Sequence, residues 1–263
     1  MNHLGGKDPL LQEEADGVMT LRLNRPGKFN SLSEAMLDAL FGAVETIAAS
    51  PAVRCVVIAG EGRAFCAGHD LEEMRGRPRY DYYRALFGRC GQLMLALQRL
   101  PVPVIARVHG VATAAGCQLV AACDLAIAAE SARFAVSGVN LGLFCSAPAV
   151  PLSRNVAAKR AFDMLVTGRF IDARTALEWG LVNAVVPDGA LDEAVGSKTR
   201  EVLSKSAAAI RHGKSMFYRQ SQMSEADAYD YAAEVMARNM MEQDTRDGID
   251  GFLRKGAAPA ARR

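Results

Sequence analysis

The sequence predicts an α/β fold followed by a helical C-terminal region. As far as about Ala129, β-branched runs alternate with glycine-containing turns and apolar helical stretches, which is typical of stacked β-β-α units with parallel sheet. No strand-like run follows Pro187, and residues 191–255 are rich in Ala, Met and charged side chains, with apolar positions at helical spacing. We therefore expect a first region over residues 1–188 and a helical second region over residues 189–263.

The N-terminal segment is expected to form a β-hairpin and then a helix. Two strand-like runs, Leu10–Glu14 and Val18–Leu23, are joined by a short turn that contains Asp-Gly, a combination that favours a hairpin. Ser31 or Ser33 is the predicted N-cap of the next helix, which ends near Ala49. A serine hydroxyl suits this position because it accepts a hydrogen bond from a first-turn N–H group.

Three apolar runs predict buried strands in the middle of the chain. Val53–Gly60, Val104–Val108 and Leu125–Ala129 are short and rich in β-branched or small apolar residues, which favours strands over helices. Between the first two lies a helix-periodic segment near Tyr82–Arg99, and the prolines that follow, beginning with Pro101, end it.

The composition excludes several classes of protein. The chain has 263 residues, half of them hydrophobic, and a formal net charge of +2, so nothing points to nucleic acid or an anionic membrane as a partner. The longest apolar stretches are shorter than the ~20 residues that a membrane span requires. Met1–Gln12 has no apolar segment of the kind found in signal peptides. We expect a cytoplasmic protein.

The six cysteines indicate buried, reduced thiols. They stand at positions 55, 66, 90, 117, 123 and 145, with no C-x-x-C pair and no histidine at metal-ligand spacing. In a chain of this size such cysteines are typical core residues of a cytosolic protein. We expect no metal site.

The segment Arg107–Asp124, RVHGVATAAGCQLVAACD, carries the strongest functional signal. A strand, a glycine turn and a run of small residues open an apolar helix, so free backbone N–H groups and the positive helix end face the space before Ala115 and Gly116. That arrangement suits a developing oxyanion. Gln118 lies three residues later and is expected on the same helix face, but an amide cannot act as an acid or a base.

Together with RAFCAGHDL, this segment resembles the enoyl-CoA hydratase/isomerase (crotonase) family. The resemblance extends from about Leu11 to Lys255 and is greatest for the subgroup of enoyl-CoA-hydratase-domain-containing proteins. It implies a crotonase-like spiral of β-β-α repeats, followed by a C-terminal helical trimerisation region. The motifs occur in the family's order at Asn24–Ser33, Arg63–Leu71, Arg107–Asp124, Phe134–Leu143, Leu165–Pro187 and Met241–Lys255.

The resemblance implies that two backbone amides, those of His69 and Ala115, form an oxyanion hole for a thioester carbonyl. Two such donors polarise the C=O group and stabilise an enolate. Gly68 and Gly116 are expected to let the backbone approach the ligand closely. The side chain of His69 has two candidate roles, as a general base or as a hydrogen-bonding group near the thioester. Asp70 is expected to cap the following helix.

Two family glutamates that hold water and move the α-proton are absent. The first falls on Gln118 and the second on Gly138, and Asn140 stands two residues beyond. Each acid or base group typically contributes 10²–10⁴-fold, so the loss of both removes roughly 10⁴-fold or more. Gln118 or Asn140 could still orient a water or a polar substrate group, but ordinary hydration is not expected.

By resemblance, coenzyme A is part of the substrate and no cofactor is held permanently. Lys28 matches a position that presents a basic side chain to the nucleotide phosphates, and Phe252 and Lys255 match a terminal segment that often closes the CoA site of a neighbouring subunit. The expected assembly is a homotrimer, or a hexamer made of two trimers. The expected CoA-binding residues are Lys28, Ala67, Gly68, His69, Asp70, Gly116, Phe252 and Lys255.

Three functions remain as alternatives at this point. The first is an acyl-CoA enzyme of fatty acid metabolism that handles an enolate, and decarboxylation belongs here because loss of CO₂ needs enolate stabilisation and no initial base. The second is a CoA-ester binding protein without catalysis. The third, a serine hydrolase, we set aside because Ser137 lies in AVSGV and not in G-x-S-x-G.

Overall fold

A computed structural model describes residues 8–256 and confirms the α/β class. The described residues fall into two compact units that divide between Arg200 and Glu201. Each unit is described separately below.

The first unit contains a six-stranded sheet in the order β1-β2-β3-β5-β7-β10. The predicted hairpin is present, with Leu10 opposite Leu23, and every later neighbour in this sheet is parallel. β3 is buried along its whole length, as its β-branched run predicts. The strands are β1 (Leu10–Ala15), β2 (Val18–Leu23), β3 (Cys55–Gly60), β5 (Val104–Val108), β7 (Leu125–Ala129) and β10 (Ala184–Val186).

A second sheet has four short strands in the order β4-β6-β8-β9. The pairs β4/β6 and β6/β8 are parallel, and β9 is antiparallel to β8. Consecutive strands alternate between the sheets, with β3, β5 and β7 in the first and β4, β6 and β8 in the second, so the chain winds as a spiral of β-β-α repeats. The second sheet consists of β4 (Ala64–Cys66), β6 (Val111–Thr113), β8 (Arg133–Ala135) and β9 (Ile171–Asp172).

Helices of the first unit pack in series, α1 on α3, α3 on α4, α4 on α5 and α5 on α6. α1 begins after Ser33, whose hydroxyl accepts a hydrogen bond from the Met36 amide. Three short 3₁₀ helices also occur, η1 (Pro26–Lys28), η2 (Ser137–Leu141) and η3 (Asp188–Ala190). The α-helices are α1 (Glu34–Ala49), α2 (Leu71–Gly76), α3 (Tyr80–Arg99), α4 (Ala115–Ala122), α5 (Ser146–Asn155), α6 (Ala158–Thr167) and α7 (Ala173–Glu178).

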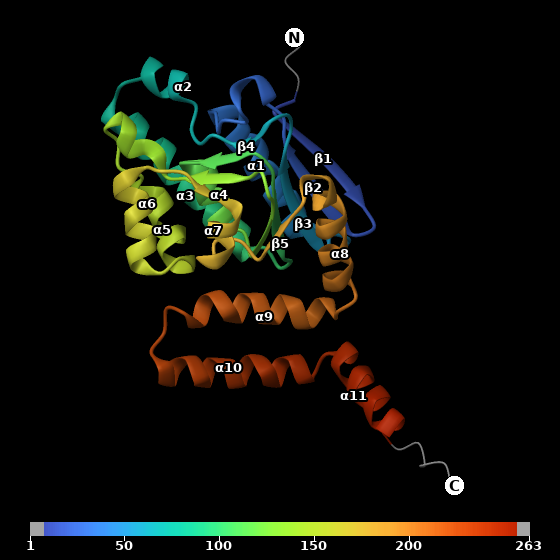
Figure 1. Ribbon diagram of the computed structural model, residues 1–263. Coiled ribbons are helices and arrows are strands. Elements are labelled where there is room, and N and C mark those ends of the chain that lie inside the picture. The colour runs from blue at the N-terminus through green and yellow to red at the C-terminus, as the bar shows by residue number, and fades with distance from the viewer. Residues whose placement is uncertain (1–7, 257–263) are drawn as a thin grey trace, which may run out of the picture. The chain divides into compact units, whose positions relative to one another are not determined.

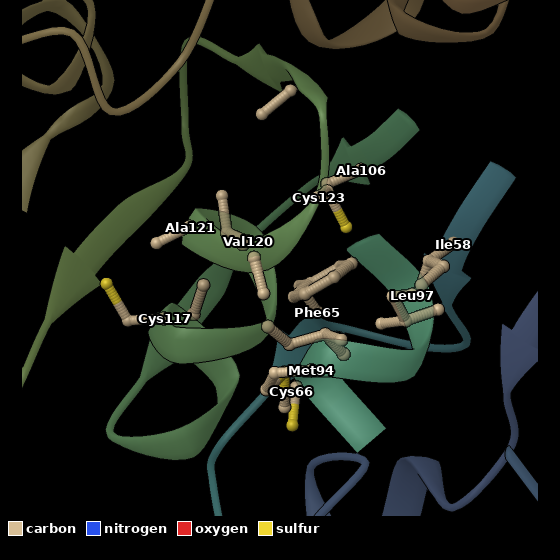
Figure 2. Close-up of a cluster of buried hydrophobic side chains, with 14 of the residues drawn as sticks. Ile58, Phe65, Cys66, Met94, Leu97, Ala106, Cys117, Val120, Ala121 and Cys123 are labelled. Carbon is tan, nitrogen blue, oxygen red and sulfur yellow. The ribbon is translucent and has the colours of Figure 1, made fainter. Parts of the chain in front are cut away.

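The core of the first unit includes residues of both sheets, and part of it lies where the second sheet meets α3 and α4. All eight residues of α4 are buried, so this helix is surrounded by protein on every side. Figure 2 shows Phe65 of β4 gathered with Leu97 of α3 and Val120 of α4. Burial of a side chain such as Phe65 contributes about 1.5–3 kcal/mol, and this packing holds the start of α4 against the end of β4. All six cysteines are buried.

The next helix, α8 (Leu191–Leu203), begins in the first unit. Leu191 and Val195 are buried, and Asp192 forms an ion pair with Arg107 of β5. The division between the two units therefore falls near the end of α8, later in the chain than the expected division between residues 188 and 189. The division lies there because apolar side chains in the first turns of α8 are buried in the first unit.

The second unit is helical and contains α9 (Ala207–Gln220), α10 (Glu225–Met240) and α11 (Gln243–Gly256). α9 and α10 lie side by side (Figure 1). Ser206 and Ser224 cap them through their hydroxyls. Large apolar side chains remain exposed here, among them Tyr229 and Met236. No helix within residues 8–256 is long and apolar enough to cross a membrane.

Candidate active site

A cavity of about 560 Å³ opens at the carboxyl ends of β4, β6 and β8. Because these three strands are parallel neighbours, the segments that follow them meet at one edge of the sheet, where open parallel sheets commonly bind ligands. The segment after β4 supplies Ala67 and His69, the segment after β6 supplies Ala114 and Ala115, and β8 leads to Gly138. The fold therefore brings together segments that lie far apart in the sequence.

The predicted pair of amide donors lies on this edge. Leu32 donates to the carbonyl of Gly68 at 2.7 Å, and the amide of Asp70 donates to Leu32 at 3.4 Å. This bridge uses the residues on either side of His69, and within the described residues no acceptor takes the His69 N–H. Ala115 is the first residue of α4, so its N–H has no acceptor within the helix. Both residues line the cavity.

The two donor loops are in contact, and two glycines make this possible. A Cβ atom at Gly68 would lie 3.1 Å from the Ala115 nitrogen, and one at Gly116 would lie 2.0 Å from the carbonyl oxygen of Cys66. Gly68 also has a φ of 92°, which disfavours other residues. The predicted close approach therefore exists, but it is to protein backbone, and neither glycine lines the cavity.

Ala114, between β6 and α4, has an unusual backbone. Its φ is 50° and its ψ is −120°, a region that residues with a Cβ rarely adopt. The Ala114 amide donates to Ala135 of β8 at 3.0 Å, and this bond helps to hold the strained conformation. Because Ala114 immediately precedes Ala115, its geometry sets the direction of the Ala115 N–H.

His69 lines the cavity, and the Nε2 atom of its imidazole is shielded from solvent. Its Nε2 atom exposes less than 1 Å² and forms no hydrogen bond, while the ring packs edge-on against Phe87 with 5.3 Å between centroids. Burial lowers the pKa of His69 to about 4, so the ring is neutral at pH 7. Such a weak base is poorly matched to proton abstraction at neutral pH, which favours the hydrogen-bonding role.

Asp70 is a structural residue at the cavity wall, and the prediction that it caps a helix is confirmed. Its carboxylate accepts from the first-turn amides of Glu72 and Glu73 in α2 and from Arg25 at 2.9 Å. Ser31 adds a further hydrogen bond at 3.3 Å. Burial by itself raises the pKa of Asp70, but the hydrogen bonds and the positive charge of Arg25 outweigh it, and the pKa is lowered. The ionised carboxylate therefore fastens the Arg25 loop to α2.

Gly138 and Gln118, the two positions where the family resemblance predicts glutamates, have different surroundings. Gly138 lines the cavity, but a Cβ there would lie 2.4 Å from the carbonyl oxygen of Leu143 and 2.8 Å from the sulfur of Cys145. Gln118 is outside the cavity lining, and its Oε1 lies 4.0 Å from the sulfur of Cys90 on α3. The expectation that Gln118 points into the site is wrong, because the protein packs around every face of α4.

Asn140 also points elsewhere. Its amide donates to the carbonyl of Gly168 at 3.3 Å, at the end of α6, and Asn140 is absent from the cavity wall. On the same segment, Ser137 does line the cavity and shares a 2.8 Å hydrogen bond with Thr113. The 3₁₀ conformation of η2 thus turns Asn140 away from the site.

The mouth of the cavity carries the one lysine of the described lining. Lys28 on η1 forms an ion pair with Glu72 on α2, with 2.8 Å from Nζ to each carboxylate oxygen. Both side chains are exposed enough to separate, at 49% and 80%. Phe252 and Lys255 lie on α11 in the second unit, and Phe252 is largely exposed.

Sequence reasoning missed most of the apolar wall. These residues come from α2, α3 and the segment that runs from the end of η2 into α5, whose patterns resemble ordinary core or surface helix. Leu71, Leu141 and Leu143 lie inside the motifs Arg63–Leu71 and Phe134–Leu143, and Cys145 lies close to the second, but none of the three leucines was predicted as a lining residue. Among the described residues, no group of three His, Cys, Asp or Glu side chains is arranged to hold a metal ion. The missed lining residues are Leu71, Met74, Phe87, Leu141, Leu143, Phe144, Ala147 and Pro148.

The two alternating sheets, wound as a spiral with the cavity at the ends of the second, define the crotonase fold. The same fold is found in an enoyl-CoA hydratase of Mycobacterium smegmatis, with a TM-score of 0.94, 56% identity and coverage of 95% of this chain and 97% of that one. It is also found in human enoyl coenzyme A hydratase domain-containing protein 3, with a TM-score of 0.91, 40% identity and coverage of 96% and 99%.

Sequence comparison leads to the same family. Residues 13–261 match the family described as enoyl-CoA hydratase/isomerase. A relative from Xenopus laevis, named enoyl-CoA hydratase domain-containing protein 3, mitochondrial, is 43% identical over 94% of this chain and 83% of its own length. The chain belongs to the enoyl-CoA hydratase/isomerase family, and the predicted resemblance is confirmed.

Proposed function

We propose that the protein binds an acyl-CoA thioester and stabilises its enolate through the amides of His69 and Ala115. The observation that carries this proposal is the meeting of two uncommitted N–H groups from adjacent loops at the wall of an apolar cavity. Donors fixed in a site that excludes water are worth about 3 kcal/mol each to a developing oxyanion. Lys28 at the cavity mouth suits the phosphates of coenzyme A.

The reaction proceeds without the paired carboxylates of a hydratase. The carboxylates on the described cavity wall are Asp70, which is bonded to Arg25, and Glu72, which is bonded to Lys28. Neither is placed to deliver a proton to an acyl chain, and His69 is a weak base. Chemistry that generates an enolate without a protein base, such as decarboxylation of a 2-carboxyacyl ester, is compatible with this arrangement.

The second candidate function is binding of CoA esters without turnover. The observation that favours it is the sealed position of Gly138, where packing leaves no room for a catalytic side chain. The expected assembly in both cases is a homotrimer or hexamer in the cytoplasm. Sedimentation analysis of the purified chain tests the assembly. The animal relative's name places that protein in mitochondria.

The test is a titration of the full chain with a short 2-enoyl-CoA, a 3-enoyl-CoA and methylmalonyl-CoA, following both binding heat and product. Binding with slow or no hydration, together with CO₂ or an isomerised ester as product, supports an enzyme that uses the oxyanion site. Tight binding of all esters without product supports the non-catalytic function. Hydration at ordinary enzymatic rates contradicts the argument from Gln118 and Gly138, and absence of binding contradicts the proposal as a whole.

A further inference from the structure

A loop formed by residues 29–32 lies beside the segment that carries His69. Leu32 pairs with His69 in a parallel β-bridge, in which the Leu32 amide donates to the carbonyl of Gly68 at 2.7 Å and the Leu32 carbonyl accepts from the amide of Asp70 at 3.4 Å. The middle residue of such a bridge directs its own N–H and C=O away from the partner strand. The loop therefore turns the His69 N–H away from Leu32, and the position of the loop fixes where that amide points.

The shape of this loop depends on side chains and not on regular secondary structure. Phe29 and Asn30 have φ values of 49° and 55°, in the left-handed region that residues with a Cβ rarely adopt. The buried side chain of Asn30 donates to the carbonyls of Glu61 and Ala64 at 2.8 and 2.7 Å. These two bonds fix the loop to the turn between β3 and β4 and involve neither residue beside His69.

The guanidinium of Arg25 joins the loop to the segment that carries His69. Its Nη1 atom lies 3.2 Å from both the carbonyl oxygen and the hydroxyl oxygen of Ser31, and 2.9 Å from the carboxylate of Asp70. Ser31 precedes Leu32 and Asp70 follows His69, so these bonds flank the parallel bridge. The Asp70 side chain is only 7% exposed and that of Arg25 25%, and charge-assisted hydrogen bonds in such a shielded pair hold a defined geometry.

We propose that Arg25 is a positioning residue, which holds the His69 N–H in the direction that polarises the carbonyl of a bound thioester. The inference rests on the proposed function, because it takes that N–H as an oxyanion donor. Arg25 is not part of the described cavity lining, so it acts through Ser31 and Asp70 and not by contact with the ligand. A lysine would keep the positive charge but not the planar, rigid set of donors that an arginine presents.

The test is infrared difference spectroscopy of the full chain saturated with butyryl-CoA that carries ¹³C at the thioester carbonyl. In the unmodified protein the C=O stretch of the bound ester should lie at a lower frequency than in solution, because two hydrogen bonds weaken the C=O bond. In Arg25→Lys about half of this shift should remain, since Ala115 still donates. Because the ester is saturating, a loss of affinity or of folded protein does not move the frequency.

Arg22→Lys is the matched control, because Arg22 lies on β2 just before the loop and pairs with Glu61 at 3.0 Å and not with Asp70. It should keep the full shift. Asp70→Asn is the second variant, since asparagine can still cap α2 but lacks the charge that Arg25 binds. It should lose as much of the shift as Arg25→Lys, and the double variant should lose no more than either single one, because both remove the same link.

The outcomes separate the inference from the proposed function. If the unmodified protein does not bind the ester, or binds it without a shift of the C=O stretch, both are wrong. If the shift is present and Arg25→Lys and Asp70→Asn keep it in full, the positioning role is wrong and the proposed function stands. An equal loss in Arg22→Lys also overturns the inference. If Arg25→Lys does not fold, the result for Asp70→Asn decides.

Discussion

The loops that follow β4 and β6 differ sharply from the loop that follows β8. The first two keep uncommitted main-chain donors at Ala115 and His69, whereas the third presents Gly138 at the position where the family resemblance predicts a glutamate. Main-chain donors depend on backbone geometry, which several small residues maintain together. An acid or base depends on one side chain. The comparison teaches that backbone geometry can hold main-chain donors at the wall of a cavity where no acid or base side chain stands beside them.

The largest expected effect comes from restoring a glutamate in the β8 loop. Gly138→Glu should destabilise the protein by about 3 kcal/mol and should not restore hydration, since its Cβ would meet Leu143 and Cys145. Gly138→Ala is the control, because it introduces the same Cβ without a carboxylate. The measurements are denaturant unfolding and hydration of a 2-enoyl-CoA. A Gly138→Glu variant that is stable and hydrates the ester would contradict this prediction, because it would show that the loop after β8 has room for a catalytic carboxylate.

A nearly equal loss of stability is expected when the pH is lowered, because His69 on the loop after β4 becomes protonated. Burial lowers the pKa of His69 from 6.5 to about 4, so the unfolded chain binds more protons between these values. Stability from the neutral ring is complete above pH 6.5 and is lost as the pH falls toward 4, by about 3 kcal/mol. Unfolding curves at pH 7.5 and 4 should show a smaller loss in His69→Gln, and equal losses would mean that the ring is not buried as described.

A smaller effect distinguishes two glycines that share a left-handed backbone. Gly68 has a φ of 92° with the Ala115 nitrogen nearby, while Gly142 has a φ of 77° with nothing within 4 Å of an added Cβ. Both alanine variants carry the backbone strain, so only the crowding differs. Gly68→Ala should be about 2 kcal/mol less stable than Gly142→Ala and should lose roughly tenfold or more in butyryl-CoA affinity. Equal affinities of the two variants would contradict the placement of the donor loops.

The smallest effect is expected at the cavity mouth. Glu72→Gln frees Lys28 from its ion pair and should tighten CoA binding by less than about fivefold, since exposed pairs contribute only ~0.2–1 kcal/mol. Glu73→Gln is the neighbouring control, because Glu73 bonds the amide of Glu34 and not Lys28. Weaker CoA binding by Glu72→Gln would argue against Lys28 as the phosphate contact.

The fold could be predicted from sequence wherever an element is long enough to show a period. β3, β5 and β7 and the helices α1 and α3 were predictable from β-branched runs, caps and apolar spacing. The three-residue strands β4, β6 and β8 contain too few positions for any period to be visible. They were implied only by the family resemblance, although they build the edge on which the cavity lies.

The site was predictable in its main chain and less so in its side chains. Small residues around His69 and Ala115 indicated free amides because few other structures need that pattern. The direction of Gln118 was predicted wrongly, since helix-face reasoning assumes that one face is open and α4 has none. The strain at Ala114 could not be foreseen, because its conformation depends on the bond to Ala135 on a neighbouring strand.

The burial of α4 has a consequence for how the two ends of the proposed thioester ligand would respond to salt. Protein packs around the sides of α4 and its first turn faces the cavity, so a ligand that fills the cavity would keep mobile ions away, and the field at that turn would be screened little by the solution. Lys28 is half exposed at the cavity mouth, and its attraction for phosphate is screened fully. Rising ionic strength should therefore loosen the nucleotide end of the ligand while the carbonyl stays equally polarised, so that salt separates anchoring from activation within one molecule.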